Sequence, residues 1–223
     1  MIVREATAAD VPAVARVQVA SWRAAYRGII DDEALRGLSV EDKQSYWLQW
    51  CLRNEPQRFM RVIDDDARAV GFAVAGPARG RTPGPDGLPA VGEIYVLYLM
   101  PHVQRRGWGT QLVRSMARGL RQRGLDALIL WVLQRNHAAC RFYESIGGVA
   151  TYRRRSAVGR QHLVEIGYLW DDLERLTDPA RTRRHEDPGA DARRAASPGA
   201  RPEPRPPPAA DPPSDSCSPL GGA

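Results

Sequence analysis

The stretch that decides the fold is Gln104–Thr110, which reads Gln-Arg-Arg-Gly-Trp-Gly-Thr. Before it lies an unbroken apolar run, Ile94–Met100, bounded by Gly92 and Pro101, and this pattern predicts a buried strand. After it, apolar residues recur at helical spacing up to Gly124, namely Leu112, Val113, Met116, Ala117 and Leu120. Two glycines at a strand-to-helix turn let the backbone approach a ligand, and the free N–H groups of the first helical turn favour an anion. We therefore expect a phosphate group to bind at this turn.

The same turn excludes two better-known phosphate-binding motifs. The Walker loop ends in Gly-Lys-Ser/Thr and the dinucleotide fingerprint needs three spaced glycines, whereas this turn has Gly107, Gly109 and no lysine. A glycine pair could also serve only a positive φ or close packing between helix and strand. The stretch does match Gln/Arg-x-x-Gly-x-Gly/Ala, the acyl-CoA signature of the GNAT superfamily of N-acetyltransferases, and the sequence resembles that family.

A second block resembles the same family. The apolar run Leu128–Leu133 is followed by Gln134–Gly148, which is similar to the family's asparagine-to-tyrosine helix and its glycine-rich exit. Asn136 is a good N-cap for this helix, and Gly147 with Gly148 forms a C-terminal stop. The resemblance covers roughly residues 1–170. It implies a GNAT-like α/β fold, with a central mixed, mostly antiparallel sheet flanked by helices.

The resemblance implies acetyl-CoA as the acyl donor, bound where the central strand and the next parallel strand splay apart. The central strand would hold the pantetheine arm through its backbone, and the amides of the turn would hold the pyrophosphate. The implied cofactor-binding residues are Leu97, Tyr98, Leu99, Arg105, Arg106, Gly107, Trp108, Gly109, Thr110 and Asn136, although the last could be an N-cap alone. We expect the glycines to matter more than the arginines, because charges on an open rim contribute little.

Acetyl transfer to an amine needs a neutral amine, a polarised thioester and a proton for the departing thiolate. The resemblance implies Tyr143 as the general acid, and a phenol keeps its proton at neutral pH; the alternative is a core tyrosine on an amphipathic helix. Glu93 is the candidate base, with a pKa raised by a buried strand entrance, unless it is an exposed strand end. Many relatives carry a glutamate where this chain has Trp131, which disfavours the subgroup that acetylates ribosomal protein N-termini.

The acceptor is expected to be a small-molecule or peptide amine. Trp22 and Tyr26 share one helix face, where they either line the amine pocket or pack the helix onto the sheet. We expect direct transfer, because Cys140 has no histidine at a recognisable position to activate it. The alternative function is a non-catalytic acyl-CoA-binding regulatory domain. A homodimer is possible, because GNAT domains often dimerise.

Other patterns place further elements around the two motifs. The predicted elements are a strand at 2–6, a helix capped by Asp10 or Thr7 and ending at Tyr26, a helix from about Val40, a hairpin of strands 59–63 and 69–74, and strands 150–155 and 161–170. The Pro- and Gly-rich segment 76–92 predicts a long connection that overhangs a binding surface. The resulting order, β-α-α-β-β-β-α-β-α-β-β, is the GNAT order.

The composition divides the chain into a domain at residues 1–176 and a tail at 177–223. The tail holds 11 of the 18 prolines and lacks Val, Ile, Phe, Tyr and Trp, so we expect it to be disordered. Its Arg205–Pro208 patch could bind a polyproline-recognising partner, although a solvated tail is the simpler interpretation. Seven arginines balance seven acidic residues in the tail, which leaves the net charge of +6 to the domain.

Composition also bears on partners and compartment. The neutral tail and the lack of a groove-reading motif argue against a nucleic-acid partner, despite a pI of about 9.6. No apolar stretch is long enough to cross a bilayer, so we expect no membrane partner and a cytoplasmic protein. Cys51, Cys140 and Cys217 are isolated, and the acidic triplet Asp64–Asp66 fits turn chemistry better than a metal site. We expect no metal.

Overall fold

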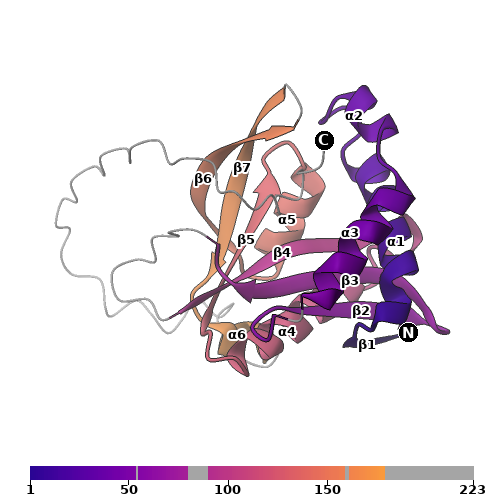
Figure 1. Cartoon of the computed structure of the whole chain (residues 1–223). Helices are drawn as coiled ribbons and strands as arrows, with labels where there is room; N and C mark the ends of the chain where they lie inside the picture. Colours follow the sequence, from indigo (N-terminus) through magenta and orange to yellow (C-terminus); the bar gives the residue numbers. More distant parts are fainter. Residues whose placement is uncertain (54, 80–89, 159–160, 179–223) are drawn as a thin grey trace, which may run out of the picture.

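The structure is a computed structural model that describes residues 1–53, 55–79, 90–158 and 161–178. Within these residues, a twisted seven-stranded sheet has the strand order β1-β2-β3-β4-β5-β7-β6 (Figure 1). Its strands are β1 (Ile2–Glu5), β2 (Phe59–Asp65), β3 (Arg68–Pro77), β4 (Val91–Leu99), β5 (Ala127–Leu133), β6 (Val149–Val158) and β7 (Gln161–Trp170). Neighbouring strands are antiparallel except β4 and β5, which are parallel. The expected mixed, mostly antiparallel sheet is confirmed.

Helices pack on both faces of this sheet. The helices of one face are α1 (Val11–Ala25), α2 (Asp32–Arg36) and α3 (Val40–Leu52), and those of the other are α4 (Trp108–Arg121), α5 (His137–Ser145) and α6 (Leu173–Thr177). Two short 3₁₀ turns, η1 (Ala8–Asp10) and η2 (Pro101–Val103), precede α1 and the glycine turn. The sheet is therefore the middle of three layers.

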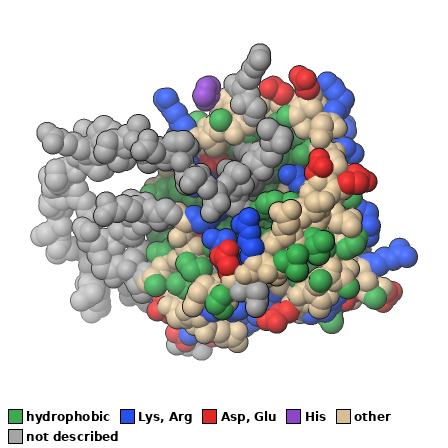
Figure 2. All heavy atoms as spheres, viewed as in Figure 1, with side chains coloured by type: hydrophobic (Ala, Val, Ile, Leu, Met, Phe, Trp, Pro, Cys, Tyr) green, Lys and Arg blue, Asp and Glu red, His purple; other side chains and the backbone are tan. Residues whose placement is uncertain are grey.

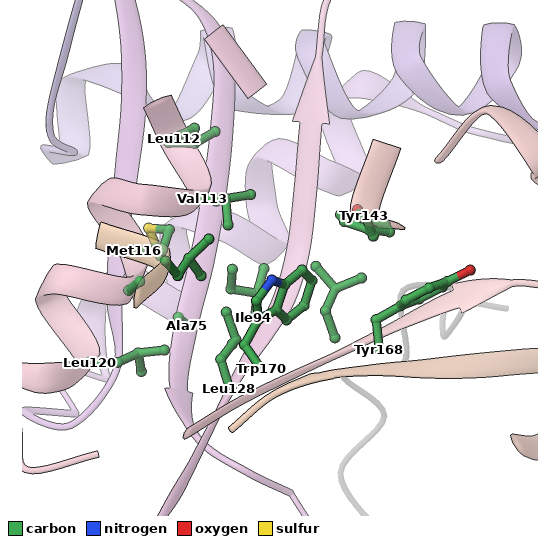
Figure 3. Packing of buried hydrophobic residues seen from close by; sticks show 14 of the residues in the cluster. Ala75, Ile94, Leu112, Val113, Met116, Leu120, Leu128, Tyr143, Tyr168 and Trp170 are labelled. Atoms are coloured by element: carbon green, nitrogen blue, oxygen red, sulfur yellow. The ribbon is translucent and has the colours of Figure 1, made fainter. Parts of the chain in front are cut away.

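Each face of the sheet has its own apolar core. In Figure 3, the residues Leu112, Val113, Met116 and Leu120 of α4 lie along the strand residues Ile94 and Leu128 and extend the core that also holds Tyr143, Tyr168 and Trp170. The opposite core is formed by α1 and α3 against Tyr95, Val96 and Tyr98 of β4. Alternating side chains of one strand thus enter both cores, which explains the unbroken apolar run in the sequence.

The start of α1 shows how local sequence sets an element. Thr7 and Asp10 form a capping box around η1, and the Asp10 carboxylate accepts from the Thr7 amide at 2.8 Å. Asp10 makes no side-chain cap bond to α1 itself, and Pro12 lies in the first turn of that helix. Arg4 of β1 pairs with Asp10 through two 2.8 Å bonds and also pairs with Asp64 of β2. This small network ties the first strand to the first helix.

The predicted order of elements is confirmed, with two additions. The five-residue helices α2 and α6 were not predicted, and each is too short to show helical periodicity in the sequence. The ends of the Pro- and Gly-rich connection belong to β3 and β4, but residues 80–89 lie outside the described residues. The turn expected at Gly159 also lies outside them, as does the tail expected at 177–223 except for its first two residues, of which Thr177 ends α6. No helix in the described part is both long and apolar enough to span a bilayer.

Candidate active site

A gap opens between β4 and β5 in the middle of the sheet. The two strands pair from Val91 opposite Ala127 up to Ile94 opposite Leu130, and the pairing stops there. A β-bulge follows immediately, because Val74 opposes Val96 and Ala75 opposes Ile94, which leaves Tyr95 as the extra residue. β5 continues to Leu133 paired with β7 alone. The end of pairing and the bulge together let β4 and β5 splay apart, between the two strands that the resemblance implied.

The backbone of β4 beyond the bulge offers specific groups to this gap. The Met100 amide donates to the Val70 carbonyl at 2.9 Å, and the antiparallel alternation then turns the backbone of Tyr98 toward β3 and those of Leu97 and Leu99 toward the gap. The Leu99 carbonyl already accepts hydrogen bonds from Ser21 Oγ at 3.0 Å and Gln104 Nε2 at 3.1 Å. Leu97 therefore presents both backbone groups to the gap, Leu99 presents its amide, and Tyr98 presents neither.

The glycine turn lies at the end of the gap and leads directly into α4. Arg105 and Gly107 both adopt left-handed backbone angles, with φ of 59° and 81°. Gly107 is the N-cap, and its carbonyl accepts the first helical bond from the Gln111 amide at 3.1 Å. Within the described residues, the amides of 105–110 have no hydrogen-bond acceptor. These free donors at a helix N-terminus form an anion site.

The two glycines of the turn have different physical roles. A Cβ on Gly107 would meet nothing within 4 Å, so that position needs glycine for its backbone angle. A Cβ on Gly109 would lie 3.1 Å from Cζ of Phe142 on α5, so this glycine allows α5 to pack closely against α4. The turn thus needs one glycine for a positive φ and the other for close packing, which joins two helices rather than the expected helix and strand. The side chains of Arg105 and Arg106 are exposed.

The second motif places its two key residues on α5. Asn136 is the N-cap of α5, and its side-chain oxygen accepts from the Ala139 amide at 3.2 Å. Tyr143 is buried among aromatic rings, with centroids 5.7 Å from Tyr168 and 6.2 Å from Trp170 (Figure 3). Burial raises the pKa of the Tyr143 phenol, and the nearby Tyr26 phenol raises it further. The hydroxyl therefore keeps its proton at neutral pH.

The phenol of Tyr143 interacts electrostatically with residues of the opposite core. Tyr26, the C-cap of α1, is one of them, and burial raises the pKa of Tyr98 of β4 with a smaller contribution from the Tyr143 phenol. Tyr143 belongs to the core under α4 and α5, whereas Tyr26 and Tyr98 belong to the core under α1 and α3. Hydroxyl groups from the two faces can approach one another only where the sheet is open. These electrostatic interactions indicate that the three phenols lie near one another on the side of the gap between β4 and β5.

Trp22 and Tyr26 are both buried and pack α1 onto the sheet. Their rings form an edge-to-face pair at 5.3 Å, and Trp22 also contacts the Tyr98 ring at 6.4 Å. Trp22 Nε1 interacts with the Tyr98 phenol, but the geometry falls short of a hydrogen bond, so Nε1 is buried without an acceptor. Burial raises the pKa of Tyr26 to about 12. Packing α1 onto the sheet therefore does not prevent Trp22 and Tyr26 from also lining the gap.

Glu93 is buried on the paired section of β4, just before the splay. Its side chain is 2% exposed, which excludes an exposed strand end. Oε1 pairs with Arg79 Nη2 at 2.6 Å, and Oε2 accepts from the Arg79 backbone amide at 2.9 Å. Both oxygens are therefore engaged by one arginine, and the Arg79 guanidinium also lies 4.4 Å from the centre of the Tyr95 ring.

A further buried carboxylate, Glu165 of β7, was missed at the level of sequence. Its only sequence signal is a charged residue inside an otherwise apolar alternation, between Leu163 and Gly167. The described residues form two surface hollows: one of about 510 Å³ beside α1 and α2, and one of about 460 Å³ between α4 and β1. Basic and acidic side chains are interspersed over the helices at the right of Figure 2.

Comparisons with known proteins agree with this geometry. Residues 22–148 match the model of the acetyltransferase (GNAT) family. The chain is 31% identical over 175 residues to the uncharacterized N-acetyltransferase YuaI of Bacillus subtilis, an alignment that covers 78% of this chain and 95% of YuaI. It is 31% identical over 138 residues to the mycothiol acetyltransferase of Rhodococcus jostii, covering 55% of this chain but only 43% of that protein.

Solved structures share the fold at lower sequence identity. The PaiA N-acetyltransferase of Thermoplasma acidophilum, solved with coenzyme A, aligns with a TM-score of 0.57 at 18% identity over 74% of this chain and 96% of its own. YncA of Salmonella typhimurium, solved with acetyl-CoA, aligns with a TM-score of 0.56 at 20% identity over 78% of this chain and 94% of its own. The family match and the relationship to YuaI show that this chain belongs to the GNAT acetyltransferase family, and that its enzyme class is that of an N-acetyltransferase.

Proposed function

We propose that this protein transfers the acetyl group of acetyl-CoA to a primary amine by direct attack of the amine on the thioester. The observation that carries the proposal is the gap between β4 and β5, which has free amides at one end and the Tyr143 phenol beside it. One opening thus combines an anion site with a proton donor. An acyl-CoA needs the first for its pyrophosphate, and acyl transfer needs the second.

The residues around the gap fit acetyl-CoA. The amides of 105–110 would hold the pyrophosphate, and the open space beside Gly107 leaves room for it. Leu97 would bind the pantetheine amides through both backbone groups and Leu99 through its amide, whereas Tyr98 would act through its side chain. The oxygen of Asn136 caps α5, which leaves its amide nitrogen for the cofactor arm or a water. When bound, acetyl-CoA supplies the activated acetyl group.

Tyr143 would act as the general acid. As the amine forms its C–N bond and the C–S bond breaks, the phenol would donate its proton to the departing sulfur. A raised pKa ensures that this proton is present throughout the neutral pH range. Trp22 and Tyr26 would line the acceptor side of the gap, where they already meet Tyr98.

Glu93 remains the first candidate for the base that receives a proton from the amine. Accepting a proton would require it to release Arg79, because that residue now engages both carboxylate oxygens. A covalent route through Cys140 is disfavoured, since burial raises the pKa of its thiol and so suppresses the nucleophilic thiolate.

The test is the substitution Tyr143→Phe, measured by release of the CoA thiol over a panel of primary amines. Loss of a general acid should lower kcat by about 10²–10⁴-fold and leave the affinity for acetyl-CoA, measured by calorimetry, unchanged. Tyr168→Phe is the matched control, because this neighbouring phenol donates to Glu144 at 2.7 Å rather than facing the gap. An unchanged kcat in Tyr143→Phe would remove that residue from the mechanism. Binding of acetyl-CoA by the wild type without thiol release for any amine would favour the regulatory alternative.

A further inference from the structure

Glu165 differs from the other buried carboxylates of the described residues, which are Asp10 and Glu93. Asp10 accepts from both Arg4 and Thr7, and Glu93 has both oxygens engaged by Arg79. Glu165, whose side chain is 1% exposed, uses only one oxygen: Oε2 pairs with Arg154 Nε at 2.5 Å. No described residue donates a hydrogen bond to Oε1.

With no donor among the described residues, Oε1 of Glu165 keeps some accessible surface although the side chain as a whole is buried. A carboxylate oxygen that stays accessible can accept a hydrogen bond from a bound ligand. Arg154 is itself fixed, because its guanidinium lies 4.1 Å from the centre of the Trp131 ring. The arginine therefore holds one side of the carboxylate and leaves the other side for a donor from outside the chain.

Glu165 lies on the acceptor side of the gap. It pairs in register with Leu133 of β5, three residues past Leu130, where β4 and β5 last pair. Leu133 belongs to the core under α1, together with Tyr26. The Glu165 charge contributes to the raised pKa of Tyr26, whose phenol also interacts with that of Tyr143. The open carboxylate and the proposed acid thus flank the same tyrosine.

The approach to this carboxylate is framed by a tethered loop between α1 and α2. Gln161 Nε2 donates to the Ile29 carbonyl at 2.9 Å, and Arg135 donates to the Gly28 carbonyl at 2.8 Å. The loop therefore joins the end of α1 to the segment after β5 and to the start of β7. The adjoining hollow of about 510 Å³ is lined by Arg23, Arg27, Asp32, Leu35 and Arg36, so positive charge predominates there.

We propose that Oε1 of Glu165 receives the ammonium group of the acceptor, and that this acceptor is a monoamine whose remainder carries no second positive charge. The proposal rests on the function proposed above and names the acceptor class for the same site. One open carboxylate oxygen can accept a charge-assisted hydrogen bond from one ammonium group. The arginines at the approach would repel the second charge of a polyamine.

The experiment compares tyramine and L-alanine amide, as monoamines, with spermidine, as a polycation. For the wild type, kcat/KM should be at least tenfold higher for the better monoamine than for spermidine. Glu165→Gln should raise KM for that monoamine at least tenfold, while KM for acetyl-CoA stays within twofold. Calorimetric titration of both monoamines into the CoA-saturated protein reports their binding directly, whether or not turnover occurs.

Two control variants separate acceptor binding from stability. Arg154→Met breaks the same ion pair as Glu165→Gln but leaves the carboxylate in place, so it should lower Tm yet keep KM for the monoamine. Asp64→Asn removes a carboxylate from a similar arginine pair, 2.5 Å from Arg4 Nε, in the β1–β2 part of the sheet. Asp64→Asn should also leave KM for the monoamine unchanged.

Three results would overturn the proposal: an unchanged monoamine KM in Glu165→Gln, equal losses of affinity in Glu165→Gln and Arg154→Met, or a preference for spermidine. Absence of binding by both monoamines to the CoA-saturated wild type would overturn it as well. Failure of the proposed function appears differently, as a wild type that does not bind acetyl-CoA or releases no thiol with any amine.

Discussion

The backbone angle at Gly107 can be tested by three substitutions at that one position. Nothing lies within 4 Å of a Cβ there, so a small side chain meets no steric obstacle, but φ is 81°. An L-residue in the left-handed region costs about 1–2 kcal/mol, and a β-branched residue costs more. Gly107→Ala should therefore lose about 1–2 kcal/mol and Gly107→Val more. Gly107→Asn should lose less than Gly107→Ala despite its greater bulk, because asparagine tolerates this region.

The free-energy cost of a side chain at position 107 can appear as a loss of stability or as a loss of affinity for acetyl-CoA. If the turn keeps its shape, Gly107→Ala should lower Tm by about 2–8 °C for a domain of this size. If the turn relaxes instead, the same free energy should appear as a loss of about 5- to 30-fold in acetyl-CoA affinity. Thermal unfolding and calorimetry measure the two quantities on the same samples. The reasoning is refuted if Gly107→Ala changes neither quantity, or if the losses follow side-chain volume so that Asn is worse than Ala.

Two predictions concern stability away from the gap. Hydrogen bonds from Arg4 lower the pKa of Asp10 to about 2, so its charge stabilises the fold above pH 4 and loses that effect as pH falls toward 2. Asp10→Asn should cost about 2 kcal/mol in urea unfolding at pH 6 and almost nothing near pH 2; a pH-independent difference would contradict this. Gly119→Ala should be destabilising by about 1 kcal/mol or more despite better helix propensity, because its Cβ would lie 2.6 Å from the Phe59 ring. Adding Phe59→Leu should recover part of that loss. If Gly119→Ala instead stabilises the protein, the Phe59 ring moves aside and the expected steric clash is absent.

Local patterns in the sequence predicted a mixed α/β protein and the position of both motifs, whereas the GNAT-like fold followed from the resemblance that these motifs carry. The apolar run at Ile94–Met100 predicted the central strand, and the helical spacing from Leu112 to Leu120 predicted α4. Both signals arise from neighbours within one element, where periodicity follows directly from backbone geometry. The five-residue helices α2 and α6 were missed because one turn of helix carries too few apolar positions to form a pattern.

The arrangement around the gap was decided by tertiary structure. Three features join residues from different elements: the bulge at Tyr95, the close approach of Phe142 to Gly109, and the electrostatic interaction of Tyr26 with Tyr143. Strand register also turns the Tyr98 backbone away from the gap, although its neighbours in sequence face it.

What the sequence alone determined is therefore which elements form, in which order they occur, and where a free helix N-terminus follows a strand. What only the folded chain decided is which polar groups are satisfied and which remain open. Glu165 illustrates the difference, because it is one acidic residue among 26 in the sequence. Its second oxygen stays open because β6 supplies Arg154 to the first oxygen alone, in a side chain that is otherwise buried. Burial and pairing across strands depend on contacts between residues far apart in the chain, which no local pattern encodes.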